Sequence, residues 1–213
     1  MSAKDCGNHG KSRRKRLFRF LFSFFLAFII AVLFVILLVW LILRPSKPRF
    51  TLQDATVYQF NVSQNNYLSS NLQVTIASKN PNDRIGVYYD KLDVYASYRG
   101  EQITIPNSLP PTYQGHNDLN VWSPYITGQN IPIAPYFGLM LAQDQTAGMI
   151  LLNIKVNGRV RWKVGTWTSG KYHLFVNCPA YIQFGIGGKN SGSGIGSGYG
   201  NKFSLDRDCS TDV

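Results

Sequence analysis

Residue types that usually carry catalysis are scarce beyond residue 49. This part of the chain contains two histidines, His116 and His173, and a single glutamate, Glu101. His173 falls on the polar side of a predicted strand, and His116 has Asp118 nearby, but neither a nucleophile signature nor a metal-ligand spacing accompanies them. A site assembled from distant residues is the less favoured alternative. We therefore predict that the protein is not an enzyme and has no catalytic residue, no metal site and no cofactor.

One segment resembles a phosphate-binding loop. Residues 165–171 match the first seven positions of the motif G-x-x-x-x-G-K-[ST], but the eighth is Tyr172 instead of a metal-binding Ser or Thr. The residues that follow alternate as in a strand, whereas a phosphate-binding loop opens a helix. The Gly-rich residues 185–200 lack the spacing G-x-G-x-x-G. We predict that neither segment binds a nucleotide.

A row of cations is the strongest candidate for a binding surface. Lys155, Arg159, Arg161 and Lys163 all occupy odd positions and would share one face of a strand. A solvated outer face is the favoured interpretation. The alternative is a cationic patch that binds acidic lipid headgroups or an acidic extracellular polysaccharide.

A long apolar segment near the N-terminus predicts a membrane anchor. No charge lies between Arg19 and Arg44, and Ser23 is the only clearly polar residue there. A helix over residues 20–43 would span roughly 36 Å, enough to cross a hydrocarbon core of about 30 Å. A buried core helix is excluded because the segment is apolar on every side. A cleaved signal peptide is excluded because no small-residue cleavage site follows.

Flanking charge predicts the orientation of this anchor. Seven Lys/Arg precede it and only three follow within the next six residues. The more basic side stays in the cytosol, so residues 1–19 form a cytosolic arm without regular structure that attracts anionic lipid. Residues 50–213 hold twelve Lys/Arg against ten acids, so the formal net charge of +11 belongs mainly to the anchor flanks. We therefore predict no binding to nucleic acid.

This topology exposes three side chains to covalent modification. Asn61-Val62-Ser63 is the only N-glycosylation sequon, and the alternation of Tyr58, Phe60 and Val62 would point Asn61 outward. Cys178 and Cys209 would lie in an oxidising compartment, where a disulfide can form. The alternative is that Cys178 is a small buried residue with a free thiol.

The remainder of the chain has the pattern of an all-β domain. Residues 44–49 form a Pro-containing spacer, and residues 50–184 contain short alternating segments separated by Pro, Asn and Gly. We predict an antiparallel β-sandwich of the immunoglobulin or fibronectin-III type, preceded by one transmembrane helix. A short helix is expected over residues 136–145. Residues 185–213 are predicted to be a flexible Gly/Ser-rich tail that Cys209 could tie back.

The longest alternation predicts a single strand over residues 150–164. Even positions are apolar and odd positions are mainly polar, including on both sides of Asn157-Gly158. A two-residue turn at this dipeptide would place Val156 opposite Arg159 on one face and break the pattern. We therefore predict an uninterrupted strand with a weak point or bulge at Gly158.

Several motifs together resemble the plant harpin-induced-like, or non-race-specific-disease-resistance-like, family. They are NPNDRIGVYYD at residues 80–90, PPTYQG at 110–115 and GRVRWKVG at 158–165, with Tyr172-His-Leu and Cys178-Pro after them. The resemblance covers nearly the whole chain, including the basic arm and the anchor. It implies a late-embryogenesis-abundant group 2 domain with a sandwich fold and no enzymatic activity.

The resemblance also implies a function and a location. Members of this family act in pathogen- and salicylate-linked plant defence at the plasma membrane, and some are found at plasmodesmata. We expect a membrane-anchored binding domain with a protein or cell-wall partner outside the cell. Homo- or hetero-oligomers remain open. The alternative is a dehydration-protective stress protein that stabilises membrane or wall without a specific ligand.

Overall fold

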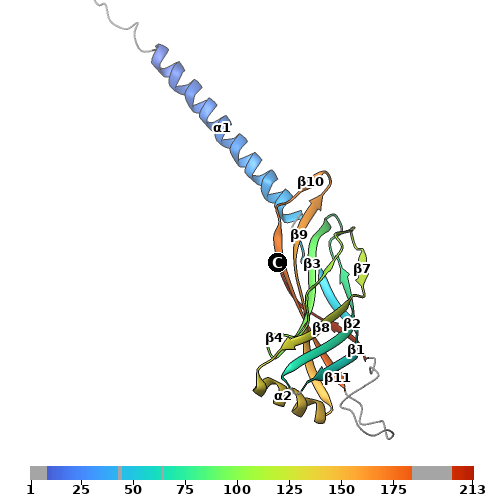
Figure 1. The fold of residues 1–213 in the computed structure, drawn as a ribbon. Helices are drawn as coiled ribbons and strands as arrows, with labels where there is room; N and C mark the ends of the chain where they lie inside the picture. The colour runs from blue at the N-terminus through green and yellow to red at the C-terminus, as the bar shows by residue number, and fades with distance from the viewer. Residues whose placement is uncertain (1–8, 43–44, 64, 184–202) are drawn as a thin grey trace, which may run out of the picture. The chain divides into compact units, whose positions relative to one another are not determined.

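The computed structural model describes residues 9–42, 45–63, 65–183 and 203–213 (Figure 1). The chain divides into two compact units, residues 1–44 and residues 45–213. Among the described residues, the first unit contains one helix and the second contains the strands and a short helix.

The first unit is the helix α1, His9–Ile42. Its 21 residues Phe18–Leu38 are long and apolar enough to cross a membrane, and none of their side chains is buried. The helix begins well inside the arm that was predicted to lack regular structure. Lys and Arg are good helix formers, and an established helix extends at low cost, which accounts for the longer helix.

The second unit is an antiparallel β-sandwich, which confirms the predicted all-β fold class. The five-stranded sheet has the order β12-β1-β2-β7, and β8 also pairs with β2. Its strands are β1 (Arg49–Val62), β2 (Tyr67–Lys79), β7 (Leu119–Trp122), β8 (Tyr125–Pro132) and β12 (Phe203–Asp208).

The other sheet has eight strands in the order β13-β11-β9-β3-β4, with β5 and β6 paired to β3 and β10 paired to β9. These strands are β3 (Gly86–Tyr98), β4 (Glu101–Gln102), β5 (Asn107–Leu109), β6 (Thr112–Gln114), β9 (Met149–Val164), β10 (Trp167–Thr168), β11 (Tyr172–Gln183) and β13 (Ser210–Asp212). The predicted short helix is α2, Pro135–Thr146.

The core lies between the two sheets and is closed by aromatic contacts. Tyr89 of β3 meets Phe50 of β1 and Trp122 of β7 edge to face, with ring centroids 6.2 and 5.6 Å apart. Inward side chains such as Val74 and Ile154 are fully buried. Each such aliphatic side chain contributes roughly 1.5–3 kcal/mol when it is removed from water.

The strand β9 runs without interruption past Asn157-Gly158, as predicted, but the bulge is not at Gly158. Pairing of β9 with β11 is regular throughout, and the register shift falls between Tyr89 and Lys91 of β3. Gly158 has a different role. A Cβ atom there would overlap the carbonyl oxygen of Lys91, so this position allows the close approach of β3 and β9.

A second register shift changes the orientation predicted for β1. The shift lies between Val57 and Gln59, so Tyr58 is exposed although alternation with Phe60 would have buried it. Asn61 is half-buried and pairs with Ser69.

The last residues of the predicted flexible tail form strands instead. The strand β12 pairs with β1 and β13 pairs with β11, so the end of the chain joins an edge of each sheet. Between the two strands the Cys209 amide donates to the carbonyl of Phe50 at 2.9 Å. Residues 185–202 of that tail lie outside the described residues.

Candidate functional site

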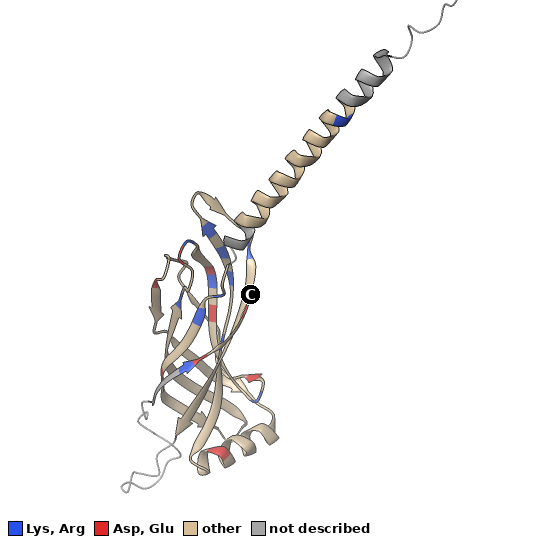
Figure 2. Cartoon of the chain, turned by 180° about the vertical axis from the view of Figure 1, so that it is seen from behind, with Lys and Arg blue, Asp and Glu red and all other residues tan. Residues whose placement is uncertain are grey.

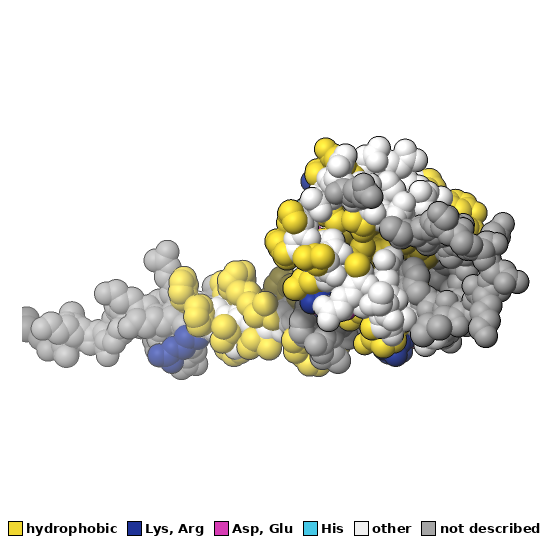
Figure 3. Space-filling view, turned by 60° about the horizontal axis from the view of Figure 1, so that its bottom comes forward, with side chains coloured by type: hydrophobic (Ala, Val, Ile, Leu, Met, Phe, Trp, Pro, Cys, Tyr) yellow, Lys and Arg dark blue, Asp and Glu magenta, His cyan; other side chains and the backbone are white. Residues whose placement is uncertain are grey.

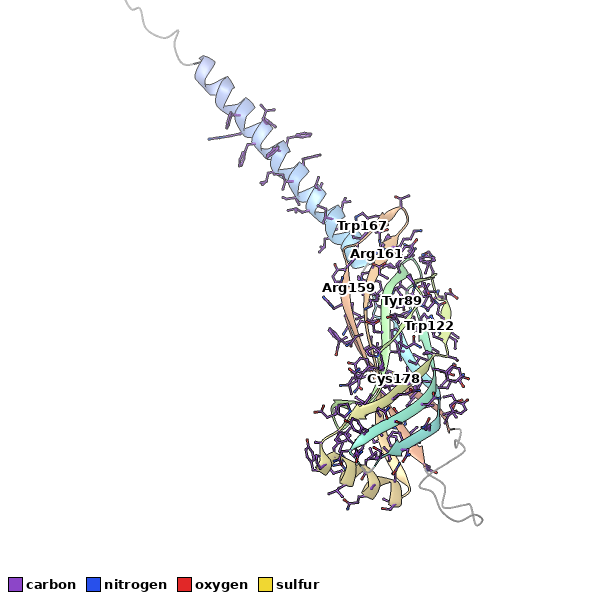
Figure 4. All side chains as sticks on the ribbon, viewed as in Figure 1. Tyr89, Trp122, Arg159, Arg161, Trp167 and Cys178 are labelled. Atoms are coloured by element: carbon purple, nitrogen blue, oxygen red, sulfur yellow. A yellow bond between two sulfur atoms is a disulfide. The ribbon has the colours of Figure 1, made fainter. Side chains whose placement is uncertain are left out.

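The cations predicted as a binding surface share one side of β9. Even-numbered side chains of β9, such as Ile154 and Val156, are buried, and odd-numbered ones lie at or near the surface. Figure 4 shows Arg161 and Arg159 in succession along this part of the domain. We call this side of the eight-stranded sheet the outer face. Its residues considered below are Tyr88, Asp90, Lys91, Asp93, Tyr113, Lys155, Arg159, Arg161, Lys163 and His173.

Arg161 is held by Asp90 of the neighbouring strand. Its Nε lies 3.0 and 2.9 Å from the two carboxylate oxygens, and its guanidinium carbon is 5.5 Å from the centroid of the Tyr88 ring. The bulge in β3 makes the Arg161–Asp90 ion pair possible. It turns two successive residues, Asp90 and Lys91, toward the outer face. Hydrogen bonding to Asp90 raises the pKa of Arg161, which stays charged.

Lys163 lies against two tyrosine rings. Its ammonium is 5.4 Å from the centroid of Tyr88 and 5.2 Å from that of Tyr113, and it donates to the Tyr88 hydroxyl at 3.2 Å. This hydrogen bond raises the pKa of Lys163. The ring centroids are 4.6 Å apart, because β6 places Tyr113 directly opposite Tyr88. A Cβ atom on Gly86 would overlap the Tyr113 side chain, so a larger residue there would have to displace the Tyr113 ring.

Lys155 and Arg159 have no carboxylate partner among the described residues. The nearby carboxylate of Asp93 is occupied, since Lys91 contacts it at 2.6 Å and Ser108 donates to it. Burial works to raise the pKa of Asp93, but hydrogen bonds from Lys91 and Ser108 bring it below its usual value. The predicted row of four cations thus divides into two engaged side chains and two available ones.

The family model described as "Late embryogenesis abundant protein" (LEA_2) matches residues 75–178. NDR1/HIN1-like protein 1 of Arabidopsis thaliana is 55% identical over 99% of this chain and 100% of its own length. The chain belongs to the NDR1/HIN1-like family. NDR1/HIN1-like protein 12 of the same plant is 51% identical over the full length of both chains. These names support a role related to plant defence or stress.

Solved structures add nothing to this assignment. A crystal structure of a protein from Archaeoglobus fulgidus superposes with a TM-score of 0.32 at 7% identity, covering 63% of this chain and 98% of that one. A similarity this weak carries no argument about function.

The three motifs that carry the NDR1/HIN1-like resemblance meet at one end of the β-domain. The buried Asn80 side chain donates to the carbonyls of Ile85 and Gly115, at 2.7 and 2.8 Å, which joins the first motif to the second. The third motif is joined to the first where Lys163 pairs with Gly86.

A second buried amide of this end holds the start of the domain. Asn82 donates to the Ser46 carbonyl and accepts from the Ser46 N–H, both at 2.8 Å. The oxygen of Asn80 accepts in turn from the backbone and side chain of Asn82. We call residues 46, 80–86, 113–118 and 163–172 the anchor end of the domain. Its buried amides have partners for their hydrogen bonds, so a structural role accounts for these residues of the motifs.

The segment that resembles a phosphate-binding loop is a hairpin. Gly165 has a φ of +57° and turns the chain from β9 into β10. The Ser169 hydroxyl accepts from the Trp162 N–H at 2.9 Å. No helix follows residue 171, since β11 begins at Tyr172, and this geometry differs from that of a phosphate-binding loop.

The histidines do not gather into a site. His173 stacks with Phe175 at a centroid distance of 6.1 Å on the outer face, whereas His116 lies in the loop after β6. Within the described part of the chain, no three His, Cys, Asp or Glu residues are grouped so that they could hold a metal ion.

The two cysteines of the β-domain are joined. A disulfide connects Cys178 of β11 to Cys209, which lies between β12 and β13. It therefore fixes the end of the chain to the middle of β11, and Figure 4 labels Cys178 about halfway along the β-domain. Cys178 is fully buried in the core.

Sequence reasoning missed three residues of the outer face. Asp90, which neutralises Arg161, is signalled by two successive polar residues, Asp90-Lys91, inside an otherwise alternating strand. Tyr88 and Tyr113 belong to quoted motifs, but no local pattern shows that strands β3 and β6 bring them together.

Proposed function

We propose that this protein is a non-catalytic binding protein of the plant plasma membrane, anchored by α1 with its N-terminus in the cytosol. Its β-domain lies outside the cytosol and takes part in the defence response by binding an acidic partner in the membrane or wall. The apolar length of α1 and the defence-related names of full-length relatives support this proposal.

One observation carries the binding role. Lys155 and Arg159 have no carboxylate partner among the residues that the structure describes. They lie on the same side of β9 as Arg161 and Lys163, which are already held. Cations that serve only to keep the domain soluble need no carboxylate or tyrosine rings to hold the cations next to them. A fixed cation–aromatic cluster next to two available cations gives an acidic ligand both orientation and charge complementarity.

A binding experiment tests this role. We expect the full chain, reconstituted in phosphatidylcholine nanodiscs, to bind polygalacturonate as an acidic probe. Binding should weaken with salt, since exposed charge attraction is screened beyond about 10 Å at 0.1 M. The double variant Lys155→Glu/Arg159→Glu should abolish binding without unfolding the domain.

A matched variant separates a site from general charge. Arg49→Glu/Lys79→Glu makes the same change in net charge at exposed positions of the other sheet. It should bind nearly as the unmodified chain does. Equal loss in both variants, or no loss in the outer-face variant, would contradict the proposed site.

The proposed topology has an independent test. Protease added to sealed, right-side-out plasma-membrane vesicles should digest the β-domain and spare the N-terminal arm. Glycosidase should lower the apparent mass of the plant protein, and Asn61→Gln should remove that shift. A protected β-domain would exclude this orientation.

The stress-protective alternative has one observation in its favour, the description of the family model as a late embryogenesis abundant protein. A protein that protects membranes physically has no saturable partner. Crosslinking at the surface of intact plant cells separates the two functions, because only the binding function predicts a partner that excess protein displaces.

A further inference from the structure

The hairpin between β9 and β10 exposes a tryptophan at its tip. Trp167 is 62% exposed, although tryptophan is one of the side chains that gains most from burial. The hairpin is firmly built. Ser169 exchanges two hydrogen bonds with the backbone of buried Trp162, each 2.9 Å long, so the tip is held against the core.

This tip lies at the anchor end of the domain. Trp167 pairs with Val164, and the adjacent Lys163 pairs with Gly86. Gly86 follows closely after Asn82, the residue that holds Ser46 by two hydrogen bonds. Figure 4 shows Trp167 at one end of the β-domain, beyond Arg161 and Arg159.

Chain length keeps Ser46 close to the point where the anchor ends. Ser46 comes four residues after Ile42, the last residue of α1, and four residues extend over at most about 14 Å. The headgroup layer on each side of a bilayer is itself about 5–8 Å thick. If α1 spans the membrane, the end of the domain that carries Trp167 is therefore tethered beside the headgroups.

The side chains around the tip have the chemistry of a membrane interface. Tryptophan and tyrosine concentrate at headgroup depth, and Lys and Arg there meet lipid phosphates. Lys171 and Tyr172 are exposed immediately after the hairpin, and Arg84 is exposed on the adjacent loop. Asp83, the acidic neighbour of Arg84, is hydrogen-bonded by Asn117 at 2.7 Å. Figure 2 shows several basic residues in this half of the domain, with acidic residues among them.

We propose that the β9–β10 hairpin docks on the phospholipid headgroup layer of the membrane that holds the anchor, with Trp167 inserted at headgroup depth. This inference rests on the anchoring part of the proposed function. Docking gives the domain a second attachment point, which restricts its rotation about the spacer. A single flexible tether would leave that rotation free.

Site-directed spin labelling of the full chain in phosphatidylcholine–phosphatidylglycerol vesicles tests the docking. In a Cys6→Ser background, labels are placed by Thr166→Cys beside the tryptophan, by Leu139→Cys in α2, and by Leu33→Cys in α1. Leu139 is 73% exposed. It lies in α2, which precedes Met149, the first residue of β9, and Met149 is roughly 50 Å along that strand from Val164. Accessibility to oxygen and to a water-soluble nickel complex reports depth.

We expect the label at residue 166 at headgroup depth, the one at 139 in water and the one at 33 in hydrocarbon. Adding Trp167→Ser should return the label at 166 to water. A label at 166 as water-exposed as the one at 139 would overturn the docking, and so would an unchanged depth after Trp167→Ser. Labels at both 166 and 139 inside the lipid would overturn it in favour of a domain lying flat. A water-exposed label at 33 would instead overturn the anchor, and the docking with it.

Discussion

The two ends of the β-domain are stabilised in different ways. At the anchor end, fully buried amides such as Asn80 have their hydrogen bonds satisfied by backbone from separate segments. At the opposite end, which carries α2 and which we call the α2 end, the corresponding polar contact is an ion pair at the surface, in which Arg99 lies 3.2 Å from Asp144. Buried polar groups are costly to leave unpaired, whereas surface pairs contribute little. The anchor end should therefore be the more rigid and the less tolerant of substitution.

Apolar exposure also differs between the ends. Several large apolar side chains are exposed in and around α2, namely Tyr67, Tyr136, Leu139, Met140 and Met149. Figure 3, in which this end comes forward, shows hydrophobic side chains spread among polar ones. At the anchor end Trp167 stands out on a hairpin tip among basic residues.

The largest expected effect comes from the disulfide, which lies between the two ends and on which both depend. Replacing Cys178 and Cys209 by serine should lower the free energy of unfolding by about 3–4 kcal/mol, from the entropy regained by a loop of 31 residues. Urea unfolding followed by tryptophan fluorescence, to which the buried Trp162 contributes, measures this loss. Peptide mapping of the plant protein without reductant checks the bond itself, and two freely alkylated thiols would contradict it.

The second prediction concerns the buried amide of the anchor end. Asn80→Ala removes four side-chain hydrogen bonds and leaves the carbonyls of Ile85 and Gly115 unpaired. We expect a loss of about 3 kcal/mol in the free energy of unfolding. Ser46 should also become labile, because Asn82 loses its own support. Amide hydrogen exchange at Ser46 reports this local effect.

Asn107 provides the matched control, since it is exposed and donates a single bond to the carbonyl of Tyr125. Asn107→Ala should cost less than about 1 kcal/mol. Similar losses of unfolding free energy in the two variants would mean that the buried amide of the anchor end stabilises the fold no more than an exposed amide does.

The sequence predicts regular parts of this molecule and misses the irregular ones. Alternation through β9 identifies the strand, its buried side and the cationic row, because one property repeats at every second residue. The bulge at Asp90 breaks this alternation, because two successive residues of β3 face outward there. Asp90 reaches Arg161 only because of this bulge. The contact between Tyr88 and Tyr113 requires β3 to pair with β6, and no local sequence pattern shows that these two strands pair.

The end of the chain illustrates a second limit of the sequence. Residues 203–212 follow a long Gly/Ser-rich segment and have too few apolar residues to predict strands alone. They form strands because β1 and β11 each offer an open edge, and because Cys209 is joined to Cys178. These open edges exist only once the sheets have assembled, so the composition of residues 203–212 cannot predict them.

The smallest effect is expected at the α2 end and depends on pH. Asp144 accepts a hydrogen bond from Tyr98, which does most to lower the pKa of this carboxyl. Burial opposes that shift, and Arg99 reinforces it. A carboxyl with a depressed folded pKa stabilises the fold fully above its unfolded value of about 3.9, and this contribution disappears as pH falls through the folded pKa. Asp144→Ala should therefore lower the free energy of unfolding by about 1 kcal/mol at pH 7 and have a smaller effect near pH 2.

Urea unfolding of the reconstituted chain at both pH values measures the difference, and Asp144→Asn separates charge from hydrogen bonding. The amide keeps an acceptor for the Tyr98 hydroxyl but cannot attract Arg99 as an ion, so it should recover part of the stability at pH 7 and remove most of the pH dependence. A loss at pH 7 as large as that of Asn80→Ala would contradict the contrast between the ends. It would show that the surface network around Tyr98 supports the fold as strongly as the buried amides of the anchor end do.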